Sequence, residues 1–324
     1  MVIIQLAGGL GNQMFQYALY LQLKSLGREV KIDDVSGFAE DVQREPALAP
    51  FGITYERPGK KELQAMLDSS MLPWQRVRRK LFGRHKKSYF EEDKLFLPKV
   101  LTWDDIYLEG YWQSEKYFRA AAEQVRAAYD TDRLISWLRE KGQWDGGGRE
   151  ADNGRDSRKQ KSVGADRKMK TAAEYFEEIN NDCSVSIHVR RGDYLTPENQ
   201  ALFGGICTDA YYMEGIRRMR ERYPQCRFYL FCNDREWENG GAWRDVEMER
   251  VALSGNQRDA DYAEFVLMSR CRHHILANSS FSWWASYLNP HPKKSVFAPE
   301  RWLNGADCTD CYRADMEKIA PHIY

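Results

Sequence analysis

The sequence has no long apolar run, no net charge and no regular set of cysteines. None of its apolar stretches approaches the roughly 20 residues that a membrane-spanning helix needs. Its 48 basic and 48 acidic residues cancel, which argues against a protein that coats nucleic acid, because such binding needs many Lys and Arg side chains against phosphates. Met1–Leu6 has neither the basic nor the apolar region of a secretory signal, so we expect a cytoplasmic location.

Seven scattered cysteines, an odd number, argue against a disulfide scaffold. Cys308 and Cys311 form a C-x-x-C pair, but a zinc site needs two more ligands at matched spacing, and the nearest histidine is a lone His322. Two D-x-D patterns are present, Asp130–Asp132 at a predicted helix end and Asp259–Asp261 just before another helix. Neither follows a predicted strand, so we expect surface acids and no required metal.

Apolar residues make up 43% of the chain and aromatic residues 13%, enough for a large core, so a wholly disordered chain is excluded. Strand-like runs alternate with helical patterns, which predicts an α/β fold with parallel sheets and helices on both faces. The expected strands are Val2–Leu6, Val30–Asp33, Ile106–Tyr111, Val185–Val189, Arg227–Cys232 and His274–Ala277. The expected helices are Asn12–Leu26, Lys116–Tyr129, Tyr211–Tyr223, Asp261–Cys271 and Phe281–Leu288.

A polar stretch, Gly142–Gly164, lies near the middle of the chain and is mostly Gly, Asn, Ser, Gln and charged residues. Such a segment buries too little apolar surface to offset its ordering entropy. The 324 residues are also enough for two domains. We therefore expect an N-terminal lobe over 1–141, a flexible insertion or linker over 142–168 and a C-terminal lobe over 169–324, with a cleft between the lobes.

A glycine-rich loop follows the first predicted strand and opens the first helix. Gly9 and Gly11 supply two glycines of the dinucleotide fingerprint G-x-G-x-x-G, but Met14 occupies the third position. Asp33 or Asp34 could stand in for the acid that binds a ribose. An NAD(P)-dependent oxidoreductase therefore remains an alternative function at this point.

Asn12 and Gln13 place two neutral amides at the mouth of the same loop. Amides both donate to and accept from sugar hydroxyls. Asn is also a good helix-capping residue, so Asn12 could have a purely structural role instead.

An arginine-rich loop follows the predicted strand Val185–Val189. Residues alternate faces along a strand, so His188 and Arg190 are expected on one side and Arg191 away from it or in the turn. Arginine is a permanently charged donor suited to phosphate, and it stabilises a departing diphosphate without a metal. The alternatives are a buried His188 and a surface ion pair between Arg191 and Asp193.

A third strand-to-helix junction contains the segment Asn278–Ser286, with Asn and Ser at the helix-cap positions. Small hydroxyls and backbone N–H groups at a helix start favour phosphate. Trp283 and Trp284 are adjacent, so they cannot share one helix face, and we expect both to pack in the core.

A basic stretch without any acid runs over 75–87 and contains seven Lys and Arg residues. It could be a solvated helix face or loop. The sharper alternative is a module that contacts anionic lipid headgroups through Arg76–Lys87 at the inner membrane face.

Taken together, these motifs resemble a known family. Gly8–Ala18, His188–Tyr194 and Asn278–Ala285 look like the sequence blocks of the α-1,2-fucosyltransferases, glycosyltransferase family 11, and Phe231–Trp237 looks like a looser fourth block. The blocks occur in the family's order from residue 8 to about 289, whereas Gly142–Gly164 has no part in the pattern.

The resemblance implies a GT-B-like fold, with an N-terminal acceptor lobe and a C-terminal lobe that binds GDP-β-L-fucose. It implies inverting, metal-independent transfer of L-fucose to the 2-hydroxyl of a terminal β-galactoside, which belongs to an oligosaccharide or a lipid-linked glycan. Carried over by position, Arg190 would bind the β-phosphate and the leaving oxygen. The other implied donor-site residues are His188, Arg191, Glu264 near the guanine, Ser279, Ser280 and Phe281. The implied acceptor-side residues are Gly11, Asn12 and Gln13.

The catalytic base stays open at this point. Asp193 is a candidate by its position after the arginine pair, but the leaving phosphate itself could accept the proton.

Overall fold

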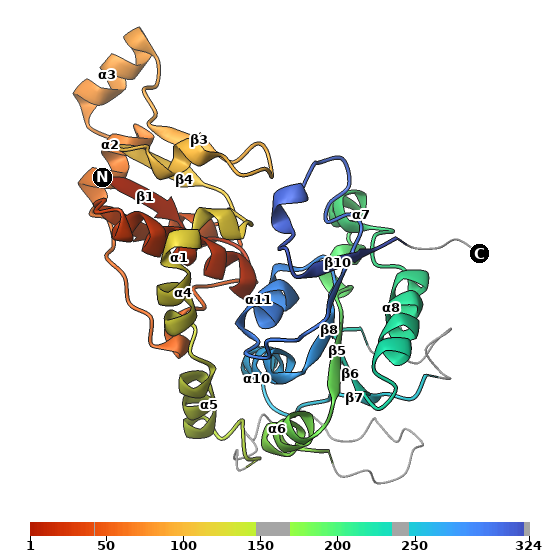
Figure 1. The fold of residues 1–324 in the computed structure, drawn as a ribbon. Coiled ribbons are helices and arrows are strands. Elements are labelled where there is room, and N and C mark those ends of the chain that lie inside the picture. Colours follow the sequence, from red (N-terminus) through yellow and green to blue (C-terminus); the bar gives the residue numbers. More distant parts are fainter. Residues whose placement is uncertain (42, 147–168, 235–245, 321–324) are drawn as a thin grey trace, which may run out of the picture.

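The computed structural model describes residues 1–41, 43–146, 169–234 and 246–320 (Figure 1). It contains two parallel sheets, one from residues before 110 and one from residues after 183. The fold is therefore α/β with two Rossmann-like lobes, the GT-B-like arrangement predicted. Most of the expected linker, 147–168, lies outside the described residues.

The first sheet has the strand order β2-β1-β4-β3. Alternate side chains of β1 pack on opposite faces: Val2 and Ile4 join the main core, whereas Ile3 packs with Met66 of helix α2 and with Tyr107. The strands of this sheet are β1 Val2–Gln5, β2 Val30–Asp33, β3 Ser88–Phe90 and β4 Ile106–Glu109. The helices of this lobe are α1 Leu10–Ser25, α2 Lys60–Leu67, α3 Pro73–Phe82, α4 Ala122–Ala128 and α5 Thr131–Glu140.

The second sheet has the strand order β10-β9-β8-β5-β6-β7. Its strands are β5 Ser184–Val189, β6 Arg227–Cys232, β7 Glu249–Arg250, β8 His273–Ile275, β9 Val296–Pro299 and β10 Met316–Ile319. Its helices are α6 Ala172–Asn181, α7 Pro197–Phe203, α8 Asp209–Arg222, α10 Gln257–Arg270 and α11 Ser280–Leu288. In Figure 1, α8 lies on one side of the sheet and α10 and α11 on the other, toward the first lobe.

The two lobes share one aromatic core. Phe15 of α1 packs 4.6 Å from Trp283 and 4.8 Å from Trp284 of α11, measured between ring centroids. Phe118 and Tyr129 of the first lobe also contact Trp284. Both tryptophans are fully buried, as predicted. The helix interface between the lobes therefore sits directly below the loops that carry the candidate site.

Several elements differ from the sequence-based expectation. The expected helix Lys116–Tyr129 is broken into two 3-10 turns and the short helix α4, because Ser114 caps a turn through the backbone N–H of Lys116 and Phe118 adopts a non-helical conformation. Strands β3, β7, β9 and β10 and helices α2, α5, α6 and α7 were not predicted, whereas α3 agrees with the helical alternative considered for residues 75–87. Within the described part of the chain, no helix is long and apolar enough to cross a membrane.

Candidate functional site

Each sheet has one point where the chain reverses its direction of winding. The second sheet winds outward from β5 to β6 and β7 on one side and from β8 to β9 and β10 on the other. In the first sheet β2 lies on one side of β1, and β4 and then β3 lie on the other. Ligands of open parallel sheets bind beyond the carboxyl ends of the strands at such switch points. We therefore expect a ligand-binding site at the four loops that follow β1, β4, β5 and β8.

Asn12 connects three of these four loops. Its Oδ1 accepts hydrogen bonds from Gln113 Nε2 at 2.7 Å and from Ser280 Oγ at 2.8 Å. Gln113 follows β4 in the first lobe, and Ser280 opens α11 in the second. One amide oxygen thus links the switch points of the two sheets. Gln113 was missed by the sequence reasoning, although the polar run after a predicted strand could have identified it.

Gly11 lets the two helix starts approach closely. A Cβ atom at this position would lie 2.5 Å from the carbonyl carbon of Ser280 and 2.7 Å from the backbone nitrogen of Phe281. The glycine therefore serves contact between α1 and α11. This corrects both sequence-based interpretations of Gly11, because backbone from the second lobe fills the space that an acceptor or a dinucleotide pyrophosphate would need.

The Asn12–Ser280 contact makes a measurable prediction. Asn12→Ala and Ser280→Ala should each lower the free energy of unfolding by about 1–3 kcal/mol, because each leaves a polar group without its partner. The double variant should cost less than the sum, with a coupling of about 0.5–3 kcal/mol from urea unfolding. Ser136→Ala on α5 serves as the control, since Ser136 Oγ donates to Asp132 O on its own helix. Full additivity of Asn12→Ala with Ser280→Ala would contradict the contact.

The loop after β5 is attached through Tyr194 to the segment that precedes α11. The Arg190 guanidinium lies 6.0 Å from the centre of the Tyr194 ring, and the Tyr194 hydroxyl donates to the Asn278 carbonyl at 3.0 Å. The buried His188 ring lies 5.7 Å from the ring of Phe281. The arginine loop and the Asn278–Ser286 segment therefore form one constellation, as their positions in the sequence suggested.

Arg191 turns toward the end of β6. Its backbone N–H donates to Asn233 Oδ1 at 2.9 Å and its Nε donates to Asp234 Oδ2 at 3.0 Å. Arg191 therefore forms an ion pair with Asp234, and the pair considered with Asp193 stays a prediction. Asp193 lies in a 3-10 helix, Gly192–Leu195, and its side chain is outside the described part of the structure, so its role as a base stays a prediction.

The start of α11 presents hydroxyl and backbone groups to the same place. The Ser279 side chain caps the helix by accepting from the backbone N–H of Phe281 at 3.3 Å. The Ser280 hydroxyl donates to Asn12, so it keeps its acceptor lone pairs for other contacts. A helix start beside an arginine suits a phosphate group.

Two acids on α10 lie near this cluster. Asp261 and Glu264 are one turn apart and therefore share a helix face. The Asp261 side chain is exposed, yet surrounding protein raises its pKa, against the opposing effects of a hydrogen bond from Gln257 and the charge of Arg190. The effect of the Arg190 charge places this carboxylate near the arginine loop. Asp261, treated as a surface acid in the sequence, thus joins Glu264 as a candidate ligand-binding acid.

His188 is held neutral in the folded protein. Burial, aided by the charge of Arg190, lowers its pKa from 6.5 to about 3. Its Nδ1 is buried and has no hydrogen-bond partner among the described residues. At neutral pH the ring is therefore an uncharged wall of the site rather than a cation for the diphosphate.

The lowered pKa of His188 predicts acid sensitivity. The unfolded chain binds more protons between pH 6.5 and 3, so stability should fall as the pH decreases through this window. In His188→Phe the slope of the free energy of unfolding against pH should be smaller. The decrease should be no larger than the slope contributed by one bound proton. Urea unfolding from pH 7 to pH 4 measures this slope. His85→Phe, at an exposed histidine, is the control, and equal slopes in His188→Phe and the wild type would contradict the prediction.

Gln13 does not face a ligand. Its amide is 1% exposed, donates to the carbonyls of Gly8 at 2.8 Å and Glu45 at 3.0 Å, and accepts from the backbone N–H of Ala47 at 2.8 Å. The expectation that Gln13 binds the acceptor directly is therefore corrected. It positions the glycine loop against the segment that contains Glu45 and Ala47.

The carboxylates needed for the dinucleotide alternative are already engaged. Asp33 accepts from two backbone N–H groups and from the Tyr107 hydroxyl at 2.8 Å. Asp34 accepts from Tyr55 and from Arg57. Neither acid is oriented toward a ribose, so the support for an NAD(P)-dependent oxidoreductase disappears.

An open, polar depression with a volume of about 570 Å³ lies on the surface of the first lobe. It is formed beyond the carboxyl ends of β1 and β2, and Gly37 in its wall packs against Leu6 and Ala7, which lead into the glycine loop. Its lining residues are Gln5, Ser36, Gly37, Ala39, Glu40, Asp41 and Gln43. Most of these carry hydrogen-bonding side chains, which suits a sugar better than an apolar ligand.

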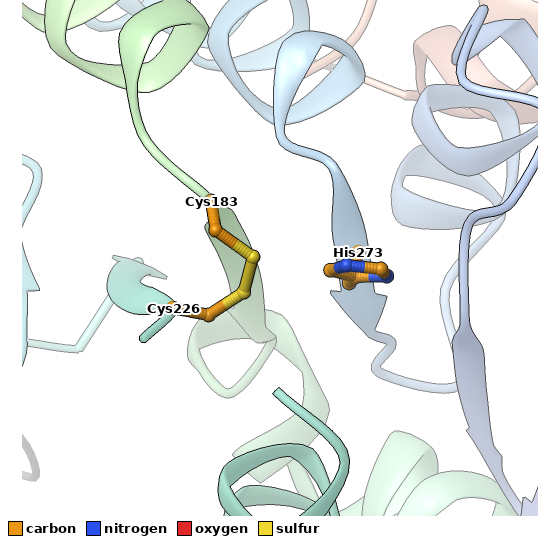
Figure 2. Close-up of side chains that lie close together, drawn as sticks. All are labelled: Cys183, Cys226 and His273. Atoms are coloured by element: carbon orange, nitrogen blue, oxygen red, sulfur yellow. A yellow bond between two sulfur atoms is a disulfide. The ribbon is translucent and has the colours of Figure 1, made fainter. Parts of the chain in front are cut away.

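A separate cluster lies at the amino ends of the central strands of the second sheet. Cys183 and Cys226 precede β5 and β6 and form a disulfide, and His273 at the start of β8 lies close to them (Figure 2). This pairing was not predicted from the sequence. Among the described residues this is the group close enough to hold a metal, but two of its three possible ligands are bonded to each other. The cluster is remote from the carboxyl ends of the strands and does not belong to the candidate site.

The acids of the D-x-D patterns have structural partners. Asp130 caps α5, so the first pattern starts a helix rather than ending one, and Asp132 pairs with Arg270 at 2.6 Å. In the second pattern Asp259 accepts from the Asn256 side chain. Cys308 and Cys311 are buried and free, and the Cys311 carbonyl accepts from Trp283 Nε1 at 2.7 Å.

Comparisons with known proteins show which proteins this chain resembles. Residues 165–308, which include the arginine loop and the start of α11, match the model of Glycosyl transferase family 11. An alpha-1,2-colitosyltransferase of Escherichia coli is 27% identical over 323 residues, covering 93% of this chain and 92% of that protein. These matches show that the chain is similar to glycosyltransferase family 11, as the resemblance implied.

The chain is also similar to two fucosyltransferases. The galactoside alpha-(1,2)-fucosyltransferase 1 of Saimiri boliviensis boliviensis is 28% identical over 284 residues, covering 87% of this chain and 63% of that protein. Among solved structures, the fucosyltransferase NodZ from Bradyrhizobium aligns with a TM-score of 0.42 and 14% identity, covering 94% of this chain and 97% of that one.

Proposed function

We propose that the protein transfers L-fucose from GDP-β-L-fucose to the 2-hydroxyl of a terminal β-galactoside, with inversion at C1. The observation that carries the proposal is the constellation at the two switch points. In one lobe Arg190 lies against Tyr194, whose hydroxyl donates to the Asn278 carbonyl two residues before α11. From the other lobe, Asn12 contacts Ser280 at the start of α11 and is held by Gln113. Both the colitosyltransferase and the fucosyltransferase relatives have names that specify an alpha-1,2 linkage, which supports the regiochemistry.

The donor diphosphate would bind between Arg190 and the start of α11. Arg190 would stabilise the charge that develops on the departing GDP. Ser279, Phe281 and the neutral His188 would shape the pocket around the pyrophosphate, and Glu264 or Asp261 would accept hydrogen bonds from the guanine N–H groups. Carboxylates suit this role because an ionised carboxylate accepts hydrogen bonds and donates none.

The acceptor would enter from the first lobe. The polar depression lined by Gly37 has room and hydrogen-bonding groups for a sugar. Asn12 Oδ1 is held by two protein donors, so the Asn12 Nδ2 amide is the part of this residue that would meet a ligand hydroxyl. Enclosing the sugar between the lobes would keep water from hydrolysing the donor.

The proposed transfer needs no metal ion. What supports this is the presence of Arg190 where a diphosphate would leave, together with the structural partners of the D-x-D acids. Equal initial rates with and without EDTA are expected, and complete loss of transfer in EDTA would refute metal independence.

The name of one relative, the alpha-1,2-colitosyltransferase, suggests GDP-colitose as an alternative donor. Colitose is L-fucose without its 3-hydroxyl. A site that hydrogen-bonds this hydroxyl strongly rejects the deoxy sugar, whereas an apolar wall discriminates weakly. GDP-L-fucose and GDP-colitose are therefore offered in competition, with lactose, lacto-N-biose and N-acetyllactosamine as acceptors. The proposal requires a higher kcat/KM for GDP-L-fucose, and the opposite order would assign colitose as the donor.

A further inference from the structure

Helix α3 exposes an unusual amount of apolar surface. Trp74, Val77 and Leu81 follow the i, i+3, i+7 pattern of one helix face, and their exposed fractions are 61%, 57% and 70%. Phe82 at the end of the helix is 81% exposed. Met71 and Leu72, just before the helix, are exposed as well. Exposed apolar side chains that are contiguous mark an interaction site more often than scattered ones do.

The same segment carries a concentrated positive charge. Residues 73–87 contain seven Lys and Arg residues and no acid. Arg78 and Arg79 pair with Asp68 and Lys87 pairs with Asp105, which leaves four basic side chains that make no ion pair with any described residue. These are Arg76, Lys80, Arg84 and Lys86, and all four are exposed or partly exposed.

The segment is held in place rather than hanging from the lobe. The nearly buried Asp68, at the end of α2, accepts from Arg78 and also accepts from the backbone N–H of His85 at 2.9 Å. The backbone N–H of Lys87 donates to the Met66 carbonyl at 2.8 Å. Both ends of the projection are therefore tied to α2. In Figure 1 α3 lies at the far end of the first lobe, away from the second sheet.

We infer that α3 docks the enzyme on the surface of a bilayer that contains anionic lipids. Trp74, Val77 and Leu81 would enter the headgroup region, and the basic side chains around them would contact lipid phosphates. A short helix with aromatic and aliphatic residues beside lysine and arginine has the composition of such interfacial segments.

Charge favours this partner over a second copy of the chain. A two-fold dimer places the same patch on both sides of the interface. Two copies of α3 would therefore oppose basic residues to basic residues, with no acid between 73 and 87 to offset them. An anionic lipid surface supplies the missing negative charge.

This inference goes beyond the proposed chemistry and does not depend on it. It gives the lobe on which we place the acceptor a fixed orientation at a membrane, where a lipid-linked glycan would be within reach. A free oligosaccharide would still be a substrate in solution. Transfer to soluble lactose and binding to vesicles therefore test separate claims.

The test is co-sedimentation of the full chain with vesicles of phosphatidylcholine, with or without phosphatidylglycerol, at low and high salt. The wild type should bind the anionic vesicles and lose binding as salt increases. Trp74→Ser with Leu81→Ser, and Arg76→Gln with Lys80→Gln, should each reduce the partition coefficient by about tenfold or more. Transfer to soluble lactose should stay unchanged in both variants.

Matched controls separate α3 from the rest of the surface. Leu26→Ser with Met169→Ser removes exposed apolar side chains elsewhere, and Arg272→Gln with Lys293→Gln removes exposed charges from the second lobe. Both controls should bind like the wild type. Salt-insensitive binding, no binding, or equal loss in the controls would overturn the inference. So would a lipid-free dimer, seen by sedimentation velocity, that the α3 variants dissociate.

Discussion

Replacing Arg190 with alanine should lower kcat for sugar transfer by about 10²–10³-fold, the usual cost of removing one preorganised charge-stabilising donor from an active site. Arg190 is the arginine at the carboxyl end of β5, and its guanidinium lies beside Tyr194, which binds the Asn278 carbonyl. In the proposed mechanism its charge acts mainly on the departing diphosphate. The loss should therefore appear in kcat more than in the KM for the acceptor.

Two variants make this prediction specific. Arg190→Lys keeps the charge but loses the planar, bidentate geometry, so it should recover only part of the rate. Arg191→Ala removes the neighbouring guanidinium, which is bound to Asp234, and should have a smaller effect on kcat. Initial rates with saturating GDP-L-fucose and lactose measure all three. Near wild-type kcat in Arg190→Ala would show that another group stabilises the leaving diphosphate.

Replacing Gly11 with alanine should destabilise the protein and also abolish most of its activity. The new methyl group would meet the backbone of Ser280 and Phe281 at 2.5–2.7 Å, and backbone atoms cannot move aside as a flexible side chain can. Overpacking of this kind costs about 1–3 kcal/mol or more. The displacement would separate Asn12 from Ser280, so kcat should fall together with the melting temperature.

Gly9 supplies the matched control for this change. It lies two residues away and precedes α1 with φ −74°, and a methyl group on its Cα would meet no atom of the described residues within 4 Å. Gly9→Ala should therefore unfold within about 0.5 kcal/mol of the wild type, as surface substitutions usually do. Calorimetry and lactose assays compare the pair. Equal melting temperatures for Gly11→Ala and Gly9→Ala would show that the contact between α1 and α11 is absent in solution.

Local patterns predicted the parts of the fold that depend on neighbouring residues. The strands over Val2–Gln5, Val30–Asp33 and Arg227–Cys232 were found to within a residue, because each is a short apolar-rich run bounded by polar or turn residues. The starts of α1 and α11 were found to within two residues, because glycine or Asn and Ser at the cap positions mark them. These boundaries place the glycine loop and Ser279 at carboxyl ends of strands.

The missing parts depend on contacts between distant segments. The link from Asn12 to Gln113 and Ser280 joins residues 101 and 268 positions apart, and spacing along the chain does not reveal it. Gln13 was predicted to bind a ligand because its burial against Glu45 and Ala47 depends on tertiary contacts that the local sequence does not reveal. Membrane docking was suggested by charge alone, whereas the exposure of Trp74 became visible only in the folded chain.

The acids of α10 show a third limit. Asp261 read as part of a D-x-D pattern, and the helix was expected to begin with it. In the structure the helix begins at Gln257, and the charge of Arg190 acts on the Asp261 carboxylate. The sequence did not show this proximity, because Arg190 and Asp261 are far apart along the chain.

The central claim is α-1,2 transfer of L-fucose from a GDP-linked donor at the meeting point of the two sheets. The most direct measurement is the NMR structure of the product formed from GDP-L-fucose and lactose by the wild-type chain, with Arg190→Ala run in parallel. The account predicts α-L-fucose on the 2-hydroxyl of galactose, formed by the wild type and at least about a hundredfold more slowly by the variant. A different linkage, or no fucosylated product from a folded wild-type protein that binds GDP, would contradict it.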